Sequence, residues 1–279
     1  MIRQTCVAGL FYEADEELLT RNIELLFNGV EDVDISDENS IKSIVVPHAG
    51  YVYSGRTAAY AFNELSRENL PDTFIIIGPN HTGIGDKLSL TNSKIWNTPL
   101  GDIDVDVEFI NKLNEVDLNC TIDESAHIRE HSIEVELPFL QYIARNKNKD
   151  FRIVPIIIKY QHPQLCKQLA KSIHEVSNQL NRKIMIIAST DLTHYEDSDT
   201  AKFLDTKVMR AIDNMDSDDL FKQIVEYDIT MCGYGPTITA IEYSKLSGAK
   251  NSYILNYSNS GDVSGDYDSV VGYTSAMIK

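Results

Sequence analysis

Three mainly apolar runs of the sequence each end in a polar turn that carries a histidine. The runs lie at residues 41–46, 73–77 and 183–188, and the histidines that follow them are His48, His81 and His194. Short runs of this kind, rich in isoleucine and valine, are typical of strands buried on both faces of a parallel sheet. Open α/β sheets bind their ligands just outside the carboxyl ends of such strands. The repetition therefore predicts a functional site at one edge of a sheet.

Segments with the apolar spacing of helices alternate with these strands along the chain. Helices are predicted over residues 15–27, 56–65, 107–116, 133–144, 163–180, 200–215, 217–227 and 237–246. Strands are predicted over 152–158, 252–257 and 270–277, a hairpin or pair of irregular strands within 87–106, an extended piece over 5–12, a polar connector over 120–130 and an acidic loop over 31–40. No linker, low-complexity tract or repeat divides the chain. We therefore expect one domain over residues 1–279, an α/β fold in which helices flank a mostly parallel or mixed sheet.

The charge and composition narrow the choice of partners and compartment. The formal net charge is −17, with 42 acidic against 25 basic residues, and such a field repels phosphate backbones, so we expect no nucleic acid partner. No apolar run approaches the roughly 20 residues of a membrane span, and the N-terminus lacks the apolar core of a secretory signal. We expect a cytoplasmic protein without a membrane partner. The four cysteines form no C-x-x-C pair, which argues against a disulfide framework or a zinc finger.

His48 and His81 are candidate metal ligands. Neutral imidazole is the commonest metal ligand in proteins, and it can be buried without a second charge. If the strands that precede them pair, the two rings can share one cation. A single histidine in a loop is more often an ordinary hydrogen-bonding residue, but three at equivalent strand ends favour a functional role.

Asp191, His194 and His131 are candidates for acid–base chemistry. Asp191 lies three residues before His194 and could orient its ring, which would make His194 a general base or an outer support of a metal site. Equally, Asp191 could cap the turn that follows. His131 and Glu134 would meet on a helix, and metal ligation, acid–base work and simple helix-start polarity all stay open for them.

Cys232 lies between Met231 and Gly233, in a tight turn before a predicted helix. A helix N-terminus lowers the pKa of a thiol, which suits a nucleophile or a metal thiolate. The alternative is a buried cysteine that acts as a small hydrophobic side chain.

Six motifs, taken together and in order, resemble those of the Memo family, which is named for a mediator of receptor-driven cell motility in animals. The motifs are PHAGY at 47–51, GPNH at 78–81, TPLGD at 98–102, EHSIE at 130–134, STDLTH at 189–194 and CG at 232–233. The similarity extends over nearly the whole chain, from residues 8–12 to residues 272–273. It implies a fold like that of the class III extradiol dioxygenases, the non-haem iron enzymes that open catechol rings.

The resemblance also implies a metal pocket in which His48, His81 and Cys232 match the family's metal-site residues. Asp191 and His194 match further motif positions beside that pocket. In animal relatives the pocket has been linked to phosphotyrosine peptides and to copper- or iron-dependent redox chemistry. The dioxygenases hold iron with two histidines and a carboxylate, whereas the third matching residue here is a cysteine. A softer thiolate favours copper(I), zinc or a differently tuned iron, so ring cleavage does not follow from the fold.

Three hypotheses of function result. In the first, His48, His81 and Cys232 bind Fe(II), copper or zinc, with no organic cofactor, and support redox or dioxygenase-like chemistry on an unknown substrate. His194, Asp191 and His131 would then assist catalysis. In the second, the same pocket is a non-catalytic module for a peptide or small molecule, and the acidic chain argues against a phosphate-rich ligand. In the third, the Cys232 thiolate hydrolyses a substrate without metal, with a histidine as base.

Overall fold

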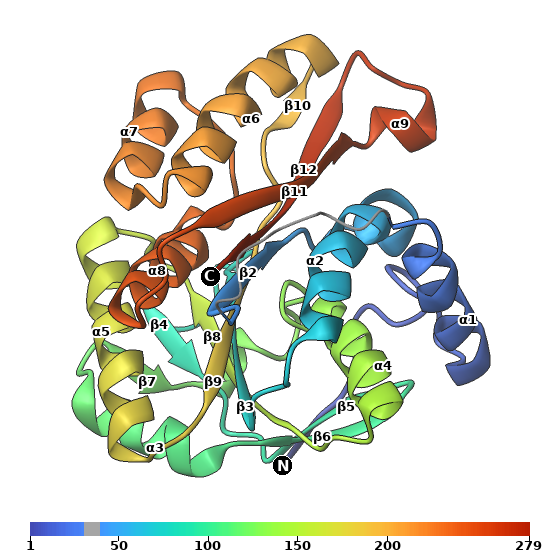
Figure 1. Cartoon of the computed structure of the whole chain (residues 1–279). Helices are drawn as coiled ribbons and strands as arrows, with labels where there is room; N and C mark the ends of the chain where they lie inside the picture. Colours follow the sequence, from blue (N-terminus) through green and yellow to red (C-terminus); the bar gives the residue numbers. More distant parts are fainter. Residues whose placement is uncertain (31–39) are drawn as a thin grey trace.

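The computed structural model describes residues 1–30 and 40–279, and the strands of this part of the chain form one twelve-stranded sheet (Figure 1). The strand order is β1 (Ile2–Arg3), β5 (Ile95–Thr98), β6 (Gly101–Val105), β8 (Arg152–Ile158), β3 (Thr73–Pro79), β9 (Ile184–Ser189), β2 (Ser43–Val46), β12 (Val270–Ile278) and β10 (His194–Glu196). In addition, β11 (Ser252–Asn259) pairs with β12, while β4 (Leu88–Leu90) pairs with β7 (Cys120–Ile122) and with β8.

The centre of the sheet is parallel and its flanks are mostly antiparallel. Strands β6, β8, β3, β9 and β2 each run parallel to the next. Strand β12 is antiparallel to β2, and β10 and β11 are antiparallel to β12. The predicted α/β fold with a mostly parallel or mixed sheet is therefore confirmed. Every residue of β3 and β2 is buried, which is why these strands read as continuous apolar runs.

Helices cover both faces of this sheet (Figure 1). One face carries α1 (Glu16–Phe27), α2 (Arg56–Arg67) and α4 (Leu137–Lys147), and the other carries α3 (Val107–Val116), α5 (Pro163–Gln179) and α8 (Tyr234–Leu246). Near the β11–β12 hairpin lie α6 (Ser198–Asp213) and α9 (Gly261–Ser264), while α7 (Ser217–Tyr227) packs against α6 and α8. Within the described residues, no helix has both the length and the apolar character that a bilayer crossing requires.

Most predicted boundaries hold to within a few residues, and the differences have local causes. Helix α8 begins at Tyr234 rather than at residue 237, because Pro236 is tolerated in the first turn of a helix. Residues 5–12 are not extended but form a turn, in which Gly9 has a φ of 80° and Ala8 bridges to Tyr12. The connector at 120–130 contains β7 and a 3-10 turn at Glu124–Ala126. The predicted acidic loop at 31–40 lies, except for its last residue, outside the described residues.

Candidate metal centre

Parallel pairing brings the ends of three strands to one edge of the sheet. Strand β9 lies between β3 and β2, with Ala188 level with Ile77 and Ser189 level with Val46. Consequently, the loops that follow these strands emerge side by side. His48 follows β2, and its side chain is buried. His81 follows β3, and a third of its side chain is exposed.

Cys232 joins this edge from the loop that precedes α8. Its backbone N–H donates to the carbonyl oxygen of Asp191, at 3.3 Å, and the next N–H, of Gly233, donates to Thr190. A Cβ atom at Gly233 would lie 2.3 Å from the carbonyl oxygen of Ser189. Glycine is therefore required for the close approach that places Cys232 against the end of β9.

The donor atoms of His48, His81 and Cys232 converge on one point. All three lie within 4.8 Å of one another, and Nε2 of His48 is 3.3 Å from Sγ of Cys232. In a tetrahedral site with ordinary metal–nitrogen and metal–sulfur bonds, ligand atoms are roughly 3.3–3.6 Å apart. The His48–Cys232 pair has this spacing, and the donor atom of His81 lies within 4.8 Å of both.

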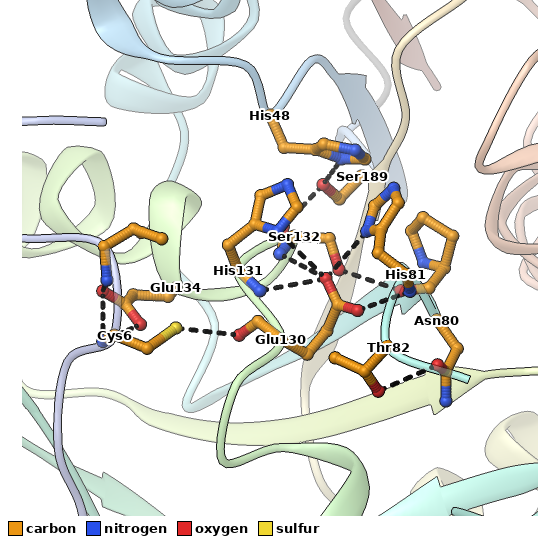
Figure 2. Close-up of polar contacts among 12 residues, drawn as sticks. Cys6, His48, Asn80, His81, Thr82, Glu130, His131, Ser132, Glu134 and Ser189 are labelled. Atoms are coloured by element: carbon orange, nitrogen blue, oxygen red, sulfur yellow. Dashed lines mark hydrogen bonds and ion pairs between the residues drawn. The ribbon is translucent and has the colours of Figure 1, made fainter. Parts of the chain in front are cut away.

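Glu130 lies behind the histidines and orients His81 (Figure 2). Its Oε1 is 2.8 Å from Nδ1 of His81, and its Oε2 accepts the backbone N–H of the same residue at 2.6 Å. A carboxylate that holds one ring nitrogen of histidine leaves the other free for a metal and increases its basicity. This role of Glu130 is not among the predictions from the sequence, although its position beside His131 was the available signal.

The Glu130 carboxylate stays charged in spite of its burial. Burial acts to raise its pKa, but the hydrogen bonds and charge of His81 and the N–H of Ser132 outweigh it and lower the pKa to about 2. The loop that holds Glu130 packs directly on β3. The packing is so close that a Cβ at Gly78 would lie 2.2 Å from Oγ of Ser132. Glycine at position 78 therefore leaves the space that the Ser132 side chain occupies.

His131 is the third imidazole of this cluster (Figure 2). Its ring stacks on His81, with centroids 4.7 Å apart, and lies 5.4 Å from the ring of His48. Phe11 covers it at 4.9 Å. Burial lowers its pKa to about 4, so His131 is neutral at physiological pH. The donor atoms of His81, Glu130 and His131 also lie within 4.8 Å of one another.

Asp191 and His194 do not form the predicted pair. Asp191 accepts the backbone N–H of His48 at 2.9 Å and thereby fixes the His48 loop. Nδ1 of His194 lies instead 3.0 Å from the carbonyl oxygen of Thr230. The prediction that Asp191 orients His194 is wrong, because the chain turns into β10 between them and His194 pairs with β12.

His131 and Glu134 also diverge. A 3-10 turn begins at Glu134, and its buried carboxylate forms an ion pair with Arg3 and accepts the O–H of Tyr12 at 2.7 Å. It further accepts the backbone N–H of Cys6. The expectation that the two residues meet on one helix is wrong, and Glu134 instead ties the N-terminal segment to the loop of the site.

The thiol of Cys232 is not activated in the metal-free chain. Burial, with the charge of Asp191, raises its pKa above the ordinary value, contrary to the low pKa expected from a helix N-terminus. Burial and the neighbouring histidines lower the pKa of His48. A thiolate–imidazolium pair for hydrolysis is thus disfavoured, whereas a bound metal ion would itself deprotonate the thiol.

The fold and site together define a mixed α/β protein with a cluster of histidines and a cysteine at the carboxyl edge of its sheet. A family model described as "Memo-like protein" matches residues 3–277. The chain therefore belongs to the Memo-like family, as its motifs predict.

Full-length relatives agree with this assignment, and a solved structure shares the fold. A "MEMO1 family protein" of Methanobrevibacter smithii is 43% identical, with 100% of each chain covered. One of Sulfolobus acidocaldarius is 44% identical, covering 99% of this chain and 98% of its own. The crystal structure of an uncharacterized protein from Escherichia coli K12 has a TM-score of 0.59 at 11% identity, covering 86% of this chain and 100% of its own. At that identity, the likeness shows the fold alone.

Proposed function

We propose that this cluster is a transition-metal centre, with His48, His81 and Cys232 as protein ligands. The observation that carries the proposal is the convergence of two imidazoles and a thiol within 4.8 Å. The rear nitrogen of each imidazole is already held, by Ser189 for His48 and by Glu130 for His81. Rings fixed in this way are the usual surroundings of a metal site.

The donor set suits copper(I), zinc or Fe(II), with no organic cofactor. Three protein ligands leave coordination positions open, and a metal there would supply redox or Lewis-acid chemistry to a bound substrate. His131 is a neutral ring next to the donors and is placed to accept a proton from such a substrate. Asp191 holds the His48 loop, and His194 is an outer support. We therefore propose a redox or dioxygenase-like activity, with the substrate unidentified.

The test is metal analysis of protein purified anaerobically without an affinity tag. We expect about one transition metal ion per chain in the wild type. The double variant with His48→Ala and His81→Ala should lose it. A matched control with His162→Ala and His174→Ala removes two histidines outside the pocket and should keep it. Full metal occupancy in the first double variant would refute the assignment.

A second candidate is a non-catalytic module that binds a peptide or small molecule in the same pocket. Exposed apolar side chains beside the site favour it, since Val52, Tyr53 and Tyr195 follow His48 and His194 and stay largely open to solvent. Ligand binding by metal-free protein, with no turnover after metal loading, would decide for this candidate. All four cysteines are free, which agrees with the cytoplasmic location that we propose for either function.

A further inference from the structure

Glu136 is a buried carboxyl group that neither proposed function uses. It ends the 3-10 turn Glu134–Glu136 that leads into α4, and its side chain is fully buried. Oε1 lies 3.0 Å from Oγ of Ser189. Oε2 has no hydrogen-bond partner, and no ion pair to Glu136 is present among residues 1–30 and 40–279.

The hydroxyl of Ser189 has three polar neighbours. They are the carbonyl oxygen of Ser132 at 2.6 Å, Nδ1 of His48 at 2.7 Å and Oε1 of Glu136 at 3.0 Å. A hydroxyl donates one hydrogen bond and accepts two. Since a carbonyl oxygen can only accept, and this contact is the shortest, Ser189 donates to Ser132. The other two neighbours must then donate to Ser189.

Glu136 can donate only as a carboxylic acid, and its surroundings favour that form. An ionised carboxylate with one bare oxygen and no counter-charge is costly to bury. A neutral acid leaves bare only a carbonyl oxygen, which is a much smaller penalty. Burial raises the pKa of Glu136 well above its usual value, and the charge of Asp191 adds to this rise.

We propose that Glu136 is a neutral acid which, through Ser189, holds His48 as the Nδ1–H tautomer with the Nε2 lone pair facing Cys232. His48 then donates from Nδ1 to Ser189, so that the nitrogen 3.3 Å from the sulfur is the unprotonated one. Glu136 is thus a positioning residue of the centre. The metal enters only through the proposed function, because the hydrogen bonds among Glu136, Ser189 and His48 are made by protein groups alone.

The experiment uses metal-free protein at neutral pH. Nitrogen-15 NMR of labelled histidines, with the His48 signals assigned by a His48→Gln variant, reports the tautomer directly. Infrared spectroscopy reports a protonated carboxyl group by its carbonyl stretch. We expect the Nδ1–H tautomer at His48 and a carboxylic acid band that disappears in Glu136→Gln. That variant should keep the tautomer, because the amide N–H can still donate to Ser189.

Ser189→Ala removes the acceptor and should give a mixture of His48 tautomers, with metal affinity lower by roughly 10–100-fold. An Nε2–H tautomer in the wild type, or a carboxylic acid band that survives in Glu136→Gln, would overturn the proposal. If Ser189→Ala does not fold, these two readouts still decide it. A fixed tautomer in a protein that binds no metal would support the hydrogen-bond chain while refuting the proposed function.

Discussion

Replacing Arg3 by methionine should destabilise the protein and disturb the candidate site at once. The buried guanidinium forms an ion pair with Glu134 and donates to the carbonyl oxygens of His127, at 3.1 Å, and Glu130, at 2.7 Å. It also lies over the ring of Trp96, 4.5 Å from its centre. These contacts join one N-terminal side chain to the segment that holds Glu130.

The expected loss follows from the charge that Arg3→Met leaves behind. Removing one partner of a buried ion pair typically costs about 3–5 kcal/mol, because the other charge stays buried. Glu134 keeps the O–H of Tyr12 and the N–H of Cys6, so we expect the lower end, about 3 kcal/mol. Adding Glu134→Gln removes the stranded charge and should restore roughly half of this.

Equilibrium urea unfolding measures the loss, and Lys112→Met is the control. Lys112 forms an exposed pair with Glu115 on one helix, which contributes under about 0.5 kcal/mol. Metal affinity of Arg3→Met, measured under native conditions, should also fall. A loss below about 1 kcal/mol in Arg3→Met, or additive losses in the double variant, would refute the account of a stranded charge.

Three further predictions concern pH, packing and metal affinity. Burial lowers the pKa of His127 from 6.5 to about 4. As pH drops from 6.5 to about 4, the unfolded chain therefore binds a proton at His127 before the folded chain does. The free energy of unfolding should fall by up to about 3 kcal/mol over this range. Urea unfolding of His127→Gln should show a shallower slope than the His162→Gln control, and equal slopes would contradict this. Gly78→Ala places a Cβ 2.2 Å from Oγ of Ser132 and should lower the free energy of unfolding, measured by thermal unfolding, by about 2 kcal/mol. Adding Ser132→Ala should restore part of this stability, and no recovery would contradict a clash with Ser132 as the cause. Glu130→Gln should weaken metal binding in calorimetric titration by roughly 10–100-fold, and an unchanged affinity would remove Glu130 from the support of His81.

Much of the fold could be predicted from the sequence because its signals are local. Continuous apolar runs identified the buried strands, and helical spacing located α3 and α7 at the residues observed. The turn at residues 5–12 could not be predicted in this way. It is held by Glu134, more than a hundred positions along the chain, and no local pattern encodes such a partner.

In the candidate site, too, some contacts could be predicted from the sequence and others could not. The meeting of His48 and His81 could be expected, because parallel strands bring their carboxyl ends to one edge. The partners of Asp191 could not, since its carboxylate bonds a backbone N–H 143 residues away rather than the histidine three residues on. The role of Glu130 likewise depends on a contact with His81 across 49 positions. Sequence spacing shows which side chains are available, and tertiary packing decides what they touch.

The wide spacing of the three donors has a consequence for how the protein folds. His48 and Cys232 are 184 residues apart in sequence, and closing a loop of that length in a flexible chain costs on the order of 5 kcal/mol. In the centre that we propose, an ion would therefore find no two of these ligands close together in the unfolded chain. We expect the sheet that brings them together to form first, and the ion to stabilise the folded state by mass action. On this proposal, the protein would fold without metal and take up the ion afterwards.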